Sequence, residues 1–153
     1  TTTPVTPRIS RVAGRHGLTV SAITSVSDTP PTVLVCLNRN NRSHEAFLKN
    51  GKIGINILGH NHHEVAGIFA SSRRTADEKF SAGAWHVSPT GVPLLDEAVV
   101  TLEGVIEQAH SVATHDVLFC KIVSITLNTQ AKSGLVWCDR AFHAIPLTVS
   151  IAE

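Results

Sequence analysis

Hydroxyl side chains are concentrated in one short stretch near the start of the chain. The stretch carries Thr19, Ser21, Thr24, Ser25 and Ser27, and a Pro-Pro break and an apolar run follow it directly. Small hydroxyl residues beside a strand let the backbone approach a flat ligand with polar edges, so that hydroxyls and amides bond ring carbonyls, a sugar chain or a phosphate. Composition alone also allows the plainer interpretation of an edge strand, because Thr and Ser are common in strands.

A second polar group follows the apolar run and precedes a predicted helix. Ser43 stands where the helix would begin, and its hydroxyl would join free backbone N–H groups in an arrangement that favours an anion. Arg39 and Arg42 are close by in the sequence and could add positive charge. The alternative for each arginine is an ordinary solvated surface position.

Histidines mark two further candidate sites. His115 stands in Ala113-Thr114-His115-Asp116 at the start of a predicted strand, and His143 closes Arg140-Ala141-Phe142-His143 near the end of the chain. Judged by residue type alone, a single strand histidine is a packed or a surface residue, and Phe142 is ordinary core.

Histidines also cluster at His60-Asn61-His62-His63-Glu64, and clustered histidines can bind Zn, Cu or Ni. No second ligand cluster stands at a recognised spacing, so we expect a solvated helix start there and no metal site. The sequence also lacks Gly-x-Gly-x-x-Gly after a strand, a Walker loop and a Gly-x-Ser-x-Gly elbow. A Rossmann nucleotide crevice and a serine hydrolase are therefore not predicted.

Length and charge narrow the class of protein. The chain has 153 residues and a formal net charge of +1, which indicates one domain, residues 1–153, that can bury a core without a metal or a disulfide. A near-neutral chain without a basic face is not expected to bind nucleic acid. No apolar run approaches the ~18 residues of a membrane span, and the start of the chain does not resemble a signal peptide.

The three cysteines, Cys36, Cys120 and Cys138, are far apart and form no Cys-x-x-Cys pair. An odd number without such spacing argues against a disulfide framework or a zinc site. All three stand in apolar, strand-like runs, where a reduced cysteine behaves as a small core residue. We therefore expect a cytoplasmic location.

The pattern of apolar residues predicts a mainly β domain with a few short helices. Residues 1–16 are interpreted as an irregular lead-in or a frayed edge strand, and residues 71–84 as an exposed loop. Strands are predicted at 17–24, 32–38, 53–58, 98–108 and 117–127, with two short ones within 134–145, and helices at 43–50 and 62–70. Long strands with only two short helices favour a closed antiparallel barrel over alternating βαβ units.

The order of these segments resembles the flavin reductases of two-component monooxygenases, a family that uses a nicotinamide donor to reduce free or bound flavin. The similarity runs from about Gly17 to Ile145. It rests on a collinear series: the Ser-rich stretch with Pro-Pro, Asn-x-x-x-x-Ser, Gly-Lys-Ile-Gly-Ile-Asn-Ile-Leu, Gly-Val-Pro-Leu-Leu, Thr-His and Phe-His. The resemblance implies a split Greek-key antiparallel β-barrel of the FMN-binding type and a homodimer. Relatives begin with a helix, which is expected to be missing or shortened here.

The resemblance also implies roles for single residues. His115 would lie near the nicotinamide as an orienting group, because hydride transfer needs no general base; the family usually has Gly where this chain has Ala113. His143 would border the flavin or cap a strand end. Phe80 and Trp85 would cover the open ring face or anchor their loop, which is the preferred interpretation for Trp85. The residues that would hold flavin along its ring edge, ribityl chain and phosphate are Thr19, Val20, Ser21, Ala22, Ser25, Val26, Ser27, Asn38 and Ser43.

The function implied is hydride transfer from NADH to FMN or FAD, with reduced flavin passed to a partner monooxygenase. The residues do not separate FMN from FAD, and the preference for NADH over NADPH comes from the resemblance. Alternatives are a flavoprotein reductase of another acceptor, such as a corrinoid cobalt, and a non-catalytic flavin-binding module. An oxidase similar to pyridoxamine-phosphate oxidase is a third, but no basic cluster clearly suits its substrate's phosphate.

Overall fold

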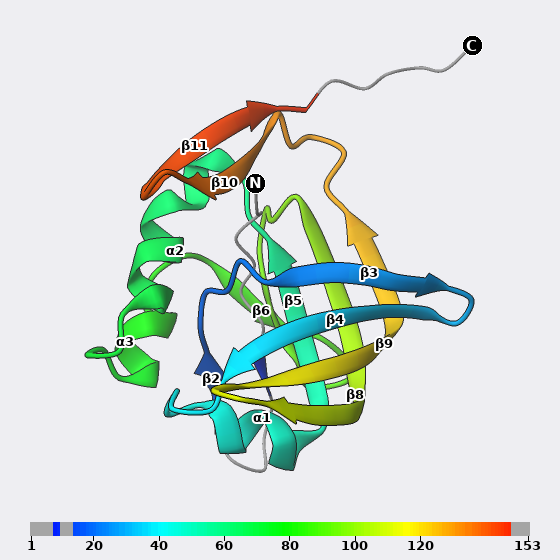
Figure 1. The fold of residues 1–153 in the computed structure, drawn as a ribbon. Coiled ribbons are helices and arrows are strands. Elements are labelled where there is room, and N and C mark those ends of the chain that lie inside the picture. The colour runs from blue at the N-terminus through cyan, green and yellow to red at the C-terminus, as the bar shows by residue number, and fades with distance from the viewer. Residues whose placement is uncertain (1–7, 10–13, 148–153) are drawn as a thin grey trace.

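Alternating apolar residues produce a mainly antiparallel sheet that curls around the core (Figure 1). The computed structural model describes residues 8–9 and 14–147. Seven strands pair in the order β2-β1-β5-β8-β9-β4-β3. Their bounds are β1 Arg8–Ile9, β2 His16–Gly17, β3 Ile23–Asp28, β4 Pro31–Asn38, β5 Lys52–Ile57, β8 Val100–Val112 and β9 His115–Leu127. Two hairpins form separate sheets: β6 Trp85–Val87 with β7 Pro93–Leu95, and β10 Ser133–Cys138 with β11 Ala141–Pro146.

The main core lies on the inner face of the long sheet. Val35 of β4 pairs with Leu118 of β9, and both side chains are almost fully buried. Phe47, from helix α1 (His44–Asn50), belongs to the same cluster and is fully buried. Burial raises the pKa of the Cys120 thiol to about 12, so this cysteine is a neutral core residue, as predicted.

Short helices flank one side of the sheet (Figure 1). They are the 3-10 turn η1 (His60–His62), α2 (His63–Ala70) and α3 (Ala76–Phe80). Phe69 of α2, Phe80 of α3 and Trp85 of β6 form an aromatic cluster with ring centroids 5.1–5.7 Å apart. Trp85 also donates its indole N–H to the Ala82 carbonyl at 2.7 Å. Phe80 and Trp85 therefore anchor this layer.

The structure corrects three local predictions. Residues 18–22 do not continue a strand from 17 to 24, because the Thr19 hydroxyl donates to the Ala66 carbonyl of α2 and draws this segment toward the helix layer. Helix α3 lies where an exposed loop was expected, because Thr75 and Glu78 form a reciprocal capping box. Cys138 is exposed rather than in the core, since it lies at the tip of the β10–β11 hairpin.

The mainly β fold, with few short helices, is confirmed. Expectations for residues 1–16, including the shortened first helix, fall mostly outside the described residues. Within the part of the chain that the structure describes, no helix is long and apolar enough to cross a membrane.

Substitution of one buried amide side chain tests what holds this core together. Asn56 of β5 is fully buried, and its side-chain oxygen accepts the Leu95 backbone N–H at 2.8 Å. Asn56→Ala leaves that donor without a partner and opens a cavity, so we expect a loss of about 2–4 kcal/mol in the free energy of unfolding. Urea unfolding measures it, with exposed Asn61→Ala as the control. Equal stability of the two variants would contradict this account.

Candidate functional site

An apolar cavity of about 260 Å³ lies between the segment after β2, helix α2 and the β10–β11 hairpin. Its lining residues are Thr19, Val20, Ser21, Gly67, Ala70, Trp137 and Phe142. Trp137 and Phe142 are cross-strand neighbours, and their rings meet edge to face at a centroid distance of 4.7 Å. The fold thus joins the hydroxyl-rich stretch to the aromatic residue near the C-terminus, which are far apart in the sequence, and gives the cavity an aromatic wall.

Thr19 contributes an acceptor rather than a donor to this cavity. Its hydroxyl proton is directed to the Ala66 carbonyl at 2.8 Å. A hydroxyl has one donor and two acceptor positions, so Thr19 can still accept an N–H from a ligand. The sequence predicted that Thr19 belongs to the site. That its hydroxyl accepts rather than donates depends on the position of α2, which the sequence does not show.

A second cavity, of about 270 Å³, is basic. It is lined by His16, Gly17, Asn40, Asn41, Arg42, Ser43, Ser72, Arg74, Thr75, Ala76 and Lys79. The two cavities flank one segment, since Gly17 lines the basic cavity and Thr19 the apolar one. An elongated ligand with an apolar ring and an anionic end matches this arrangement.

Lys79 of α3 is the most unusual charge in the basic cavity. Its side chain is buried, and its ammonium donates to the Gly17 carbonyl at 3.2 Å and to the Phe69 carbonyl at 3.1 Å. Burial lowers the pKa of Lys79, and the nearby charge of Arg42 lowers it further. An ammonium has three donors, so one remains for a ligand. Sequence reasoning missed Lys79, because a lysine among charged residues is typical of a solvated loop.

Of the polar residues predicted around Ser43, only some line the basic cavity. Ser43 is buried there, and its hydroxyl lies 3.3 Å from His16 Nδ1 without capping α1. Arg42 also lines the cavity, and its guanidinium donates to the Ser72 carbonyl. Arg39 instead donates to the Ala113 carbonyl at 3.2 Å, and Asn38 accepts the backbone N–H of Asn40.

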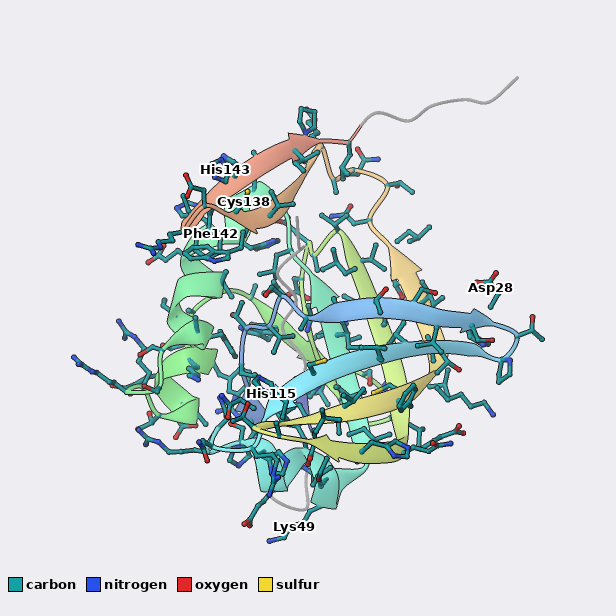
Figure 2. All side chains as sticks on the ribbon, in the orientation of Figure 1. Asp28, Lys49, His115, Cys138, Phe142 and His143 are labelled. Atoms are coloured by element: carbon teal, nitrogen blue, oxygen red, sulfur yellow. The ribbon has the colours of Figure 1, made fainter. Side chains whose placement is uncertain are left out.

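Strand β3 carries the second half of the hydroxyl-rich stretch away from both cavities. Figure 2 shows Asp28 at the tip of the β3–β4 hairpin, on the opposite side of the molecule from Phe142. Ser27 accepts the Thr29 backbone N–H at this turn. Ala22, Ser25, Val26 and Ser27 line neither cavity, and their flavin role stays a prediction.

The two candidate histidines lie on different elements, and neither lines the apolar or the basic cavity. Figure 2 shows His115 near the end of β4, whereas His143 lies on the β10–β11 hairpin. The Thr114 hydroxyl lies 2.9 Å from His115 Nδ1 and can fix the orientation of the ring. His143 Nε2 donates to the Cys138 carbonyl at 3.0 Å, which is the contact of a strand-end cap. Neither role is tested, and both stay predictions.

The histidine cluster after β5 has internal partners. His62 is buried, and its Nδ1 accepts the Gly59 backbone N–H at 3.2 Å. Burial lowers the pKa of His62, partly offset by the charge of Glu97. Among the described residues, no three His, Cys, Asp or Glu side chains are grouped as metal ligands.

Comparison with known proteins decides the family. The model of the flavin reductase like domain matches residues 1–146. The chain belongs to the flavin reductase family. It is 44% identical over 133 residues to the FMN reductase (NADH) RutF of Cronobacter turicensis, covering 87% of this chain and 79% of that one. It is 39% identical over 133 residues to the protein of the same name from Pseudomonas syringae, covering 87% and 74%.

Solved flavin reductases share the fold. A Haemophilus somnus protein assigned as a flavin reductase has a TM-score of 0.90 and 37% identity, covering 94% of this chain and 91% of that one. BorF, the flavin reductase component of a bacterial two-component tryptophan halogenase, has a TM-score of 0.89 at 23% identity, covering 96% and 92%. The family resemblance and the split-barrel expectation are therefore confirmed.

Substitution of Trp137 tests whether the apolar cavity of this flavin reductase binds the flavin ring. Trp137 is 41% exposed, so Trp137→Ala should leave the fold intact while removing a ring face from the cavity. We expect the Kd for FMN to rise about fivefold, because an aromatic contact contributes about 1 kcal/mol beyond area burial. Quenching of flavin fluorescence measures it. Phe119→Ala, outside both cavities, is the control, and equal effects of the two changes would contradict the assignment.

Proposed function

We propose that this flavin reductase transfers a hydride from NADH to FMN. The observation that carries the proposal is an apolar, aromatic-walled cavity adjoining a basic cavity that contains a buried lysine. A flavin mononucleotide has the matching parts: a flat ring with polar edges, a flexible chain and a terminal phosphate. When bound, flavin supplies the two-electron chemistry.

The residues present fit such a ligand. Trp137 and Phe142 offer ring surfaces at one end, and Thr19 offers an acceptor for a ring N–H. Lys79 and Arg42 offer charge at the other end, where the Ser43 hydroxyl adds a further polar group. The work of the protein is positioning, because holding two rings in contact replaces a bimolecular encounter with a high effective concentration. His115, with its ring oriented by Thr114, is proposed to orient the nicotinamide.

The relatives support this choice of donor and flavin. Proteins at 39–44% identity are named FMN reductase (NADH), which favours FMN over FAD and NADH over NADPH. BorF is named as the flavin reductase component of a two-component tryptophan halogenase, and another structural neighbour is named as component B of nitrilotriacetate monooxygenase. We therefore propose that reduced flavin leaves for a partner monooxygenase. Reduction of a corrinoid cobalt and non-catalytic flavin binding are less favoured, because the names of these relatives point to neither.

We further propose that residues 1–153 act as a single domain and as a homodimer. An exposed apolar surface supports the dimer, since Val123, Ile125 and Leu127 of β9 are each more than half exposed and Val26 of β3 nearly so. A second copy would bury these side chains. The three cysteines are free, which supports a reducing, cytoplasmic location.

Anaerobic reduction tests the proposed reaction. Purified protein is mixed with FMN and NADH without oxygen, and loss of the oxidised-flavin absorbance is followed against a no-enzyme control. We expect rapid bleaching. NADPH and FAD are run in parallel, and we expect both to be poorer substrates. Flavin binding without bleaching by either nicotinamide donor would support the binding module instead, and no flavin binding would overturn the proposal.

The basic cavity is tested by comparing FMN with riboflavin, which lacks the phosphate. Lys79→Met should raise the Kd for FMN about ten- to a hundredfold, since a charge-assisted hydrogen bond is lost, and should leave the Kd for riboflavin nearly unchanged. Because the pKa of Lys79 is lowered, FMN affinity of the unaltered protein should fall as pH rises through that pKa, earlier than for an ordinary lysine.

The matched control is Lys49→Met. Lys49 is an exposed lysine near α1 in Figure 2, and it pairs with Glu45. Fluorescence titration from neutral to alkaline pH gives all the constants. Equal weakening of FMN and riboflavin by Lys79→Met would contradict the phosphate assignment.

A further inference from the structure

A buried pair of side chains joins helix α1 to the β8–β9 hairpin. His44 Nε2 lies 2.6 Å from Asp116 Oδ2, and the two side chains are only 13% and 6% exposed. The other carboxylate oxygen, Oδ1, accepts the Ser111 hydroxyl at 2.6 Å. One carboxylate oxygen of Asp116 therefore contacts helix α1, and the other accepts a hydrogen bond from strand β8. We call the three side chains the His44–Asp116 clamp.

Each member of the pair directly follows a residue of the proposed site. Ser43, which lines the basic cavity, immediately precedes His44. His115, the proposed nicotinamide-orienting residue, immediately precedes Asp116. Successive side chains of a strand point to opposite faces, so Asp116 can face α1 while His115 faces away. A contact of 2.6 Å between His44 and Asp116 thus joins the backbone next to Ser43 to the backbone next to His115.

This pair is a direct side-chain hydrogen bond between the two elements, and it adds to the apolar packing of Phe47 in the main core. The backbone connects strand ends only, through Asn38 paired with His115 and the Arg39 N–H donating to the Thr114 carbonyl at 3.0 Å. Helix α1 begins after a turn, in which His44 N–H donates to the Asn41 carbonyl at 2.9 Å. The clamp therefore contributes, with these contacts, to how the start of α1, with Ser43, sits relative to the strand that carries His115.

The clamp is formed at neutral pH. The Ser111 hydroxyl and the His44 ring both hydrogen-bond to the carboxylate, and they lower the pKa of Asp116 despite its burial. A lowered carboxyl pKa means that the contribution of the clamp is present above the ordinary value and is lost only as pH falls through the lowered one. The carboxylate is thus an acceptor throughout the range in which NADH would be used.

We propose that His44 and Asp116 are positioning residues that hold the phosphate-binding side and the nicotinamide side of the site in one geometry. Neither side chain contacts flavin or NADH in this proposal, and both act through their chain neighbours, Ser43 and His115. The inference rests on the proposed function. It predicts that a single change in the clamp alters two binding constants that would otherwise be independent.

The main variants are His44→Leu, which removes the ring donor, and His44→Gln, whose amide N–H₂ can replace Nε2–H as a donor to Asp116. For His44→Leu we expect about a five- to tenfold rise in the Kd for FMN, in proportion to one lost hydrogen bond, with little change for riboflavin. The KM for NADH should rise by a similar factor. His44→Gln should restore most of both constants.

A second His–Asp pair provides the matched control. His86 and Asp96 pair at 2.5 Å between β6 and the end of β7, but they are 56% and 43% exposed and line neither proposed cavity. His86→Leu should leave both constants unchanged. Thermal unfolding of every variant shows whether a change in binding merely follows a loss of stability. If His44→Leu does not fold, Asp116→Asn serves in its place, because it keeps the shape and one acceptor.

The measured constants distinguish the clamp from a purely structural role of His44. A rise in both constants for His44→Leu, with recovery in His44→Gln, supports the clamp. A folded variant with both constants unchanged overturns it, and so does a loss of stability shared by Leu and Gln with no change in binding. If the unaltered protein binds FMN but does not oxidise NADH, the proposed function fails. The comparison of FMN with riboflavin then still decides whether the clamp positions the phosphate side.

Discussion

A single buried ammonium joins the segments that border both cavities. Lys79 belongs to α3, yet it bonds the Gly17 carbonyl at the end of β2 and the Phe69 carbonyl of α2. This contact and the hydrogen bond from the Thr19 hydroxyl to the Ala66 carbonyl together hold the irregular segment between β2 and β3 against the helix layer. A charge buried among backbone carbonyls is costly unless a counter-charge arrives. The same group that organises the site therefore favours an anionic ligand.

The two cavities are lined by different kinds of structural element. The apolar one depends on rings from a hairpin, and the basic one on side chains from short helices and turns. The long sheet contributes few of the lining residues itself. The sheet holds those segments at fixed separations, as the pairing of β4, β9 and β8 does for the start of α1 and for the end of β9 that carries His115.

The long strands were well predicted from the sequence, because apolar alternation sustained over many residues is typical of a half-buried strand and of no other element. Thr19, Ser21 and Ser43 were also predicted to belong to one site, but through family resemblance rather than spacing. Phe142 was expected in the core, and only the packing of the β10–β11 hairpin against α2 places it at the apolar cavity. Lys79 could not be found, because its burial depends on three segments packing together. Helix α3 could have been found, since Thr75 and Glu78 stand at the spacing of a capping box. The separation of Ser27 from the cavities follows from the course of β3, which the hydroxyl pattern does not encode.

In the described part of the chain, the β10–β11 hairpin, which carries the aromatic wall, is joined to the rest of the fold by few backbone hydrogen bonds. It is a separate two-stranded sheet, linked to the end of β5 by the Gly59–Gly134 bridge and by the Leu135 N–H donating to the Leu58 carbonyl. Hydrogen bonds within the seven-stranded sheet do not have to break for the hairpin to separate from α2. Local opening of such a unit requires less free energy than global unfolding. Opening of the hairpin would expose the buried side chain of Leu135 and the cavity behind the aromatic wall, while the pairing of the seven-stranded sheet stays intact.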